Sequence, residues 1–178
     1  MVNGMPDFVL PVSTNAYRLR ILNGSNSRIY RLAWQGDRPL TIIGTDGGLL
    51  EKPLLRRYAF LSPGERLEIW ADFSEDSVGF EMALVSLPFE GGTAGRGMMM
   101  GRRIMQRHRL PNGAGFMIFK IKVTKRENHD WILPPKLSEI GSFRMDAAEN
   151  FSSPKDFFLT MNHMQWSING RIFEMEDV

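Results

Sequence analysis

The segment Arg66-Leu-Glu-Ile-Trp-Ala-Asp-Phe73 decides the fold class. Every second residue is apolar, and most of the residues between them are charged. A period of two with one apolar face is typical of a half-buried strand in an antiparallel sheet. The sequence therefore predicts an all-β sandwich or barrel, with Leu67, Ile69, Ala71 and Phe73 in its core.

Three further strands are predicted upstream, over residues 18–22, 28–34 and 40–43, with Leu19 and Ile21 facing the core. Asn23-Gly24 supplies two residues that tolerate positive φ, so a tight hairpin turn is expected there. Ser62-Pro63-Gly64-Glu65 predicts a type II turn, because Pro presets φ at the second position and Gly accepts positive φ at the third. Such turns between short strands favour a sandwich.

Two segments extend this pattern toward the C-terminus. Ala114–Val123 is predicted to be the last strand of the domain, with a core face made of Met117, Phe119, Ile121 and Val123. Near the end of the chain, 156–163 and 165–173 are predicted to be two short strands. Both carry large apolar side chains, and unpaired strands are templates for association. A dimer through residues 156–173 that an intact protein would not use is therefore expected.

Three motifs carry a family resemblance: Leu22-Asn-Gly-Ser-Asn26, Ile43-Gly-Thr-Asp-Gly-Gly-Leu-Leu50 and Leu61-Ser-Pro-Gly-Glu-Arg66. In this order and spacing they resemble the middle cupredoxin domain of three-domain multicopper oxidases, such as laccases, bilirubin oxidases and periplasmic copper oxidases. The likeness covers residues 1–87 and returns at Trp166–Phe173, which is similar to the opening strand of the third domain.

The resemblance implies a cupredoxin-like Greek-key β-sandwich over residues 1–124. It implies an interdomain linker over 125–155 and the first strands of a truncated third domain over 156–178. Met1-Val-Asn-Gly4 echoes Ile168-Asn-Gly170, as if each opened such a domain, so Met1 is expected to lie inside a longer protein.

Composition sets broad bounds on function. The 178 residues are 43% hydrophobic and 24% charged, which is ordinary for a globular protein. A formal charge of +2 gives no argument for nucleic acid as a partner. No apolar run approaches the length of a membrane span, and the first residues lack a signal-peptide pattern. No membrane partner is therefore expected. With no cysteine, the chain has no disulfide and no zinc–thiolate site.

Residues 88–111 differ from the rest of the chain, since they are rich in glycine, arginine and methionine. Three interpretations stay open for this loop. The first is a solvated insertion, as long structureless loops often are. The second is an arginine-rich strip that attracts anions, and the third is a site that binds Cu(I). The last follows from the softness of thioether ligands, and it would use Met98, Met99, Met100 and Met105.

Native copper sites are not expected in this chain. A blue-copper site needs two histidines and a cysteine, and a trinuclear centre needs many imidazoles. The chain has only the isolated His108, His129 and His163 and no cysteine. No catalytic or cofactor-binding residue is predicted, and this domain alone is not expected to be an enzyme.

The resemblance implies a role in a larger protein. The parent would oxidise phenolic or metal-ion substrates by one electron and reduce dioxygen to water at copper sites in other domains. This domain would be a copper-free scaffold and cleft wall, with the first and third cupredoxin domains as its partners, in an extracytoplasmic setting. Two alternatives are a copper-free structural relative of the cell-division type and a stand-alone β-sandwich binding module.

Overall fold

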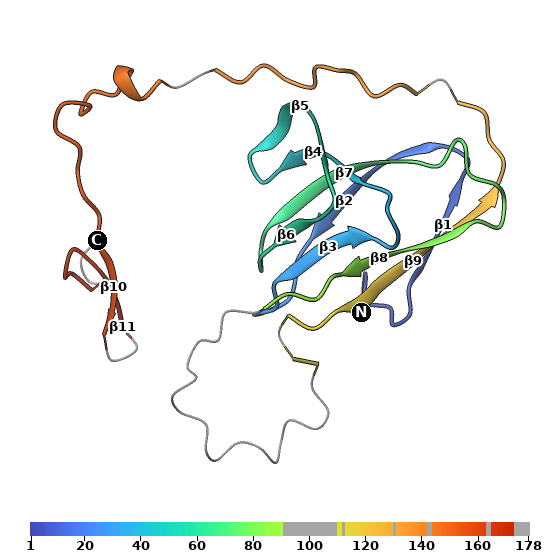
Figure 1. Cartoon of the computed structure of the whole chain (residues 1–178), viewed down its shortest axis with the longest axis horizontal. Helices are drawn as coiled ribbons and strands as arrows, with labels where there is room; N and C mark the ends of the chain where they lie inside the picture. The colour runs from blue at the N-terminus through green and yellow to red at the C-terminus, as the bar shows by residue number, and fades with distance from the viewer. Residues whose placement is uncertain (91–109, 112, 130, 142–143, 163–164, 173–178) are drawn as a thin grey trace, which may run out of the picture. The chain divides into compact units, whose positions relative to one another are not determined.

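The computed structural model describes the chain except residues 91–109, 112, 130, 142–143, 163–164 and 173–178 (Figure 1). The chain divides into two compact units, Met1–Ile140 and Gly141–Val178. The first unit extends beyond the last strand of its sandwich, which ends at Lys125, and includes the following segment up to Ile140.

The first unit is a sandwich of two sheets, visible in Figure 1 as two layers of arrows. The five-stranded sheet has the order β1 (Val9–Ser13), β9 (Phe116–Lys125), β8 (Glu81–Ser86), β3 (Tyr30–Trp34) and β6 (Ala59–Leu61). The four-stranded sheet has the order β2 (Ala16–Leu22), β7 (Arg66–Asp72), β4 (Leu40–Thr45) and β5 (Gly48–Arg56). Strands β1 and β9 run parallel, and the other pairs are antiparallel. The predicted all-β sandwich is confirmed.

The core follows the predicted alternation along β7. Ile69 and Phe73 have no exposed surface, and Leu67 and Ala71 are each 5% exposed. Leu19 and Ile21 on the neighbouring edge strand are half-buried and pack against the same cluster.

The core face predicted for β9 is wrong at one position. Phe119, Ile121 and Val123 are buried, whereas Met117 is 49% exposed. The register between β8 and β9 shifts between Leu84 and Val85, so Leu84 pairs with Phe119 but Val85 pairs with Met117. This irregularity inserts one residue, Ile118, which packs partly against the core in place of Met117.

One predicted turn is present and another is not. Gly64 has a φ of 84°, and the Glu65 amide donates to the Ser62 carbonyl, as a type II turn requires. Asn23-Gly24 is not a hairpin turn, because β2 and β3 belong to different sheets and Gly24 has no positive φ. The Asn23 side chain is instead buried as a hydrogen-bonding centre between the sheets.

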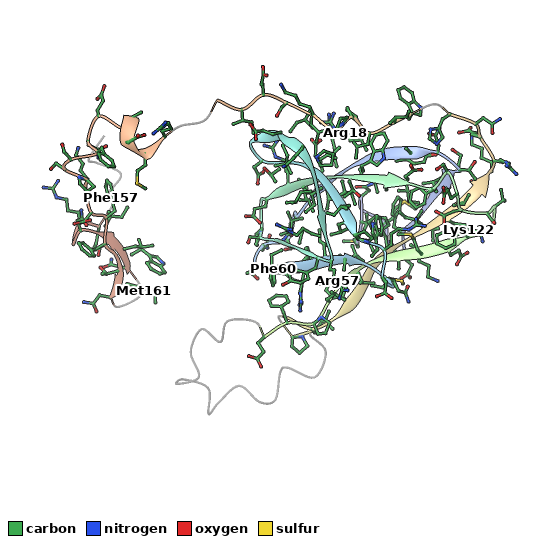
Figure 2. All side chains as sticks on the ribbon, turned by 45° about the horizontal axis from the view of Figure 1, so that its top comes forward. Arg18, Arg57, Phe60, Lys122, Phe157 and Met161 are labelled. Atoms are coloured by element: carbon green, nitrogen blue, oxygen red, sulfur yellow. The ribbon has the colours of Figure 1, made fainter. Side chains whose placement is uncertain are left out.

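The second unit contains a short 3₁₀ helix, η1 (Met145–Ala147), and an antiparallel pair, β10 (Leu159–Asn162) and β11 (Gln165–Ile168). The two predicted strands are therefore present. Their apolar side chains are exposed, including Phe157 (73%) and Met161 (60%), both labelled in Figure 2. Across the residues that the structure describes, no helix is both long and apolar enough to cross a membrane.

Candidate functional site

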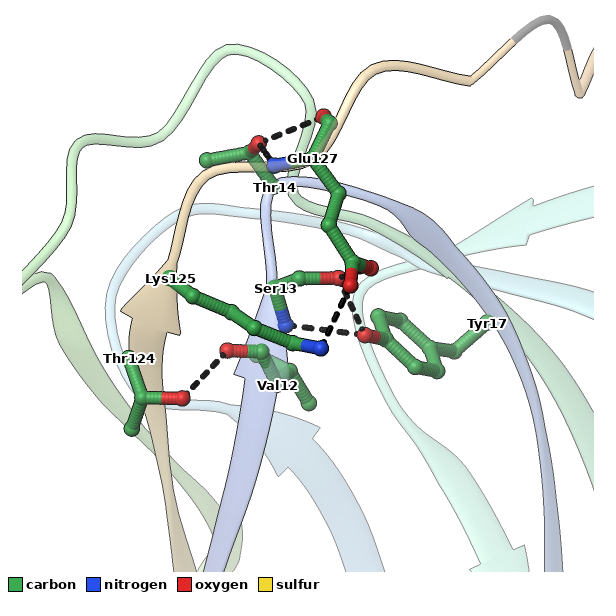
Figure 3. Close-up of polar contacts among 7 residues, drawn as sticks. All are labelled: Val12, Ser13, Thr14, Tyr17, Thr124, Lys125 and Glu127. Carbon is green, nitrogen blue, oxygen red and sulfur yellow. Dashed lines mark hydrogen bonds and ion pairs between the residues drawn. The ribbon is translucent and has the colours of Figure 1, made fainter.

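The segment that leaves the sandwich, residues 126–140, is called the strap below. Its first anchor is Glu127, drawn in Figure 3. The buried Ser13 hydroxyl donates to the Glu127 carboxylate over 2.6 Å. Thr14 completes the anchor, because its hydroxyl donates to the Glu127 carbonyl (2.8 Å) and accepts from the Glu127 amide (2.9 Å). Two adjacent side chains at the end of β1 thus fix both the backbone and the carboxylate of one strap residue.

Charge strengthens this anchor. Lys125 Nζ lies 2.5 Å from the Glu127 carboxylate. Hydrogen bonding to Lys125, and then to Ser13, holds the pKa of Glu127 below its ordinary value, while the bond to Glu127 raises the pKa of Lys125. The Tyr17 hydroxyl lies 2.7 Å from the Ser13 hydroxyl and accepts a bond from the Ser13 amide, which fixes the Ser13 side chain toward Glu127.

The far end of the strap is fixed to β5, the last strand of the four-stranded sheet. The Leu137 amide donates to the Glu51 carbonyl over 2.7 Å. The Ser138 hydroxyl lies within hydrogen-bonding distance of the Leu50 and Leu49 carbonyls (2.9 and 3.2 Å). The strap therefore occupies part of a strand edge that would otherwise present unpaired carbonyls, and it is fixed to the sandwich at both of its ends.

A second polar cluster, the neck, holds the two stems that lead to residues 91–109. Arg31 Nη1 donates to the Pro88 carbonyl (3.1 Å), and Arg28 donates to the carbonyls of Leu110 and Pro111. The Phe89 amide closes the neck by donating to Gly113 (2.9 Å).

Aromatic rings support the neck. The Arg31 guanidinium lies 3.9 Å from the centre of the Tyr58 ring, a cation–π distance. Tyr58, Phe60 and Phe89 follow one another edge to face, with ring centres 5.7 and 5.2 Å apart. The arginines of this cluster are therefore held by both carbonyl oxygens and ring faces, and the stems enter and leave at a fixed place.

The predicted methionine ligands Met98, Met99, Met100 and Met105 lie outside the described residues, and so do His108 and His163. His129 lies on the strap, where its Nδ1 accepts a hydrogen bond from the Trp131 amide (3.1 Å). Among the described residues, no three of the His, Cys, Asp and Glu side chains are grouped as a metal site would need. Without a cysteine, the donor set does not fit a blue-copper centre.

Sequence reasoning missed both anchors of the strap. Ser13 and Glu127 are 114 residues apart, and each belongs to a polar stretch without a motif. The arginines of the neck lie within a predicted strand, residues 28–34, in which Arg31 shares a face with the apolar Ile29 and Ala33. Nothing in the sequence, however, indicated the carbonyls that it contacts.

Comparisons with known proteins agree with this architecture. No protein-family model matches the chain. Over 76 residues the chain is 43% identical to the cell division protein FtsP of Photorhabdus laumondii, which covers 43% of this chain and 16% of that protein. Over 74 residues it is 40% identical to a laccase of Bacillus stratosphericus, covering 42% of this chain and 14% of the laccase.

Solved structures match over nearly the whole chain. A variant of the McoA multicopper oxidase from Aquifex aeolicus is 32% identical, with a TM-score of 0.74, and the match covers 96% of this chain and 34% of that one. A multicopper oxidase from Pediococcus acidilactici is 26% identical with a TM-score of 0.67, over 96% of this chain and 30% of its own. The chain thus spans about a third of these oxidases and about a sixth of the curated relatives. In fold and in sequence, the chain is similar to part of these multicopper oxidases, and its sandwich is cupredoxin-like.

Proposed function

We propose that this chain serves as the middle, copper-free cupredoxin domain of a multicopper oxidase, followed by the linker and first strands of a third domain. Its function is to hold copper-bearing domains of the same polypeptide at a fixed separation and to form a wall of the substrate cleft. The parent couples one-electron oxidation of phenolic or metal-ion substrates to reduction of dioxygen to water. Copper belongs to the parent's other domains, and the setting is extracytoplasmic.

The strap is the observation that carries this proposal. A domain that positions its neighbours needs a connecting segment fixed to its own surface, since a free linker of about 15 residues samples a wide range of end-to-end distances. Here the segment is held at Glu127 and again at Leu137 and Ser138. The similarity to solved oxidases over 96% of the chain supports the same arrangement, because one polypeptide there matches both units.

The neck supports the role as a cleft wall. It fixes the two stems of the loop that carries Met98, Met99, Met100 and Met105, and we propose that this loop contributes Cu(I)-binding thioethers beside the cleft. Thioether sulfur is a soft, neutral ligand suited to Cu(I).

A copper-free scaffold of the cell-division type is the second candidate. The specific observation in its favour is the 43–45% identity to FtsP proteins from several bacteria. The two candidates make the same use of the strap but differ in whether the flanking domains carry copper.

The test is to express the chain together with its flanking coding region and to load the product with copper. Blue absorption and dioxygen-dependent oxidation of a phenol support the oxidase; a product that folds but takes up no copper supports the scaffold candidate instead.

The role of the strap is tested in the same long protein. Glu127→Gln combined with Ser13→Ala should lower oxidase turnover while copper content stays unchanged. Glu139→Gln is the matched control, since this residue lies on the same strap with its side chain 86% exposed and pairs with the nearby Lys136. If the anchor variant turns over as fast as the control, the strap does not set the domain separation.

A further inference from the structure

A groove of about 260 Å³ lies on the outer face of the five-stranded sheet, beside the neck. Its floor is apolar and is made of Ala33, Val85 and Leu87. Ala33 pairs directly with Val85 across β3 and β8. Because Leu32 and Trp34 lie in the core, Ala33 and its partner face outward. The floor is therefore fixed by strand pairing before any ligand binds.

The rim of this groove carries two opposite charges that the sandwich does not use. Arg57 lines it from the link between β5 and β6, and Asp37 lines it from the turn after β3, where Gly36 has a φ of 92°. Both residues are exposed, and within the described part of the chain neither forms an ion pair with the other or with a third residue. Arg38, which also lines the groove, is paired with Asp76 over 2.8 Å. One bound molecule can therefore contact both Arg57 and Asp37.

The neck fixes the backbone from which Arg57 projects. The next residue, Tyr58, packs on the Arg31 guanidinium at 3.9 Å and against the Phe60 ring at 5.7 Å between centres. Arg31 and Phe60 are themselves directly paired across β3 and β6. Figure 2 labels Arg57 and Phe60 near each other on the sandwich. The cation on the rim is thus held beside the aromatic cluster of the neck.

We propose that this groove binds a phenolic acid, that is, a single aromatic ring carrying a carboxylate and a hydroxyl group. The ring lies on the apolar floor. Its carboxylate accepts from the Arg57 guanidinium, and its hydroxyl donates to the Asp37 carboxylate. An apolar cavity of about 150 Å³ in another protein binds benzene, so a groove of about 260 Å³ suits one ring with two small polar groups. Given the proposed function, on which this assignment rests, phenolic acids are the substrate class that this wall of the cleft binds.

The probe for this site is para-hydroxybenzoate, titrated at neutral pH into the full chain while the backbone amide signals are followed by NMR. We expect saturable shifts at Ala33, Gly36 and Val85, and none at Ile21 on β2 or Leu159 on β10. Benzoate lacks the hydroxyl and para-hydroxybenzyl alcohol lacks the carboxylate. Each should bind about tenfold more weakly, as the loss of one charge-assisted hydrogen bond implies. If all three compounds bind alike, the proposal is overturned.

Two variants separate the two polar contacts. Arg57→Gln should weaken binding of para-hydroxybenzoate about tenfold and leave para-hydroxybenzyl alcohol unchanged. Asp37→Ala should weaken para-hydroxybenzoate but not benzoate. Arg126→Gln is the matched control, because it removes the same charge from an exposed residue just past the end of β9 that lies away from the neck. The proposal fails if the shifts fall at Ile21 instead, or if Arg57→Gln and Arg126→Gln bind equally tightly or are weakened equally.

Copper has no part in this titration. A chain that does not bind para-hydroxybenzoate therefore refutes the site in the groove and leaves the scaffold role to its own test in the long protein. Conversely, a long protein that takes up no copper refutes the oxidase role and leaves the measured binding in place.

Discussion

Replacing Asn23 by alanine should destabilise the sandwich by about 3 kcal/mol. Asn23 is 1% exposed, and its Nδ2 donates to the carbonyls of Arg28 (2.8 Å) and Leu61 (2.9 Å). Each such bond contributes about 0.5–1.5 kcal/mol net, and a buried carbonyl left without a donor costs about 1–3 kcal/mol. Asn23→Ala loses both hydrogen bonds and leaves the buried Leu61 carbonyl without its donor, and these costs together give the expected loss of about 3 kcal/mol.

Asn23→Asp should cost more than Asn23→Ala. In the structure the Ser25 amide and hydroxyl donate to Asn23 Oδ1 over 3.0 and 2.6 Å, and an aspartate at this position can still accept both bonds. It donates to neither carbonyl, however, and places negative charge against both oxygens in a buried position.

The measurement is urea unfolding followed by tryptophan fluorescence, which reports on the buried Trp34. Asn26→Ala, an exposed neighbour in the same loop, is the control and should lie within about 0.5 kcal/mol of the parent chain. The argument fails if Asn23→Ala unfolds within 1 kcal/mol of the control, roughly one net hydrogen bond, or if Asp is tolerated better than Ala.

Three further predictions concern the anchor, the loop and the second unit. Because folding lowers the pKa of Glu127, the stabilisation that its carboxylate gives the strap is complete above the ordinary glutamate pKa of 4.5 and is lost as pH falls through the lowered pKa. Amide hydrogen exchange of the strap should therefore become faster at that acidic pH. In Glu127→Gln the exchange rate should no longer depend on pH in this way. The chain with Cu(II) should show no blue absorption. When Cu(I) is titrated under reducing conditions, the chain should bind one copper ion fewer after Met98, Met99, Met100 and Met105 are changed to Leu. If both chains bind the same amount, the loop is a plain insertion. The full chain should dimerise through residues 156–173, and removing the residues after Pro154 should leave a folded monomer, as light scattering would show. A full chain that stays monomeric at high concentration contradicts this prediction.

Local alternation was enough to predict the central strands. Along β7 the buried residues are Leu67, Ile69 and Ala71, as the alternation predicts, because the strand is regular and its other face, which carries Trp70 and the charged residues, is more exposed. The same rule failed at Met117, since a register shift between paired strands has no signature in the sequence of either strand. The Asn23-Gly24 pair failed for a related reason: its turn chemistry suits a hairpin, but the chain crosses there from one sheet to the other.

The strap anchors and the neck could not be predicted at all. Their bonds join residues far apart in the chain, such as Arg28 with Pro111 and Ser13 with Glu127. Each participant is a common polar residue or a backbone carbonyl, so no spacing rule singles it out. The family resemblance implied the architecture, whereas the contacts behind the proposed role of the domain exist only in the folded chain.

The parallel pairing of β1 with β9 also affects how the domain folds as it is made. Val12 and Thr124, joined by a side-chain hydrogen bond beside this pairing, are 112 residues apart. Contacts between residues so far apart in the sequence form slowly, because the chain must lose the entropy of closing a long loop before it gains the contact. On the ribosome, β1 therefore waits without its partner until β9 has emerged, and the Ser13–Glu127 bond forms only after that. The strap would thus be seated last, against a sandwich that has already closed.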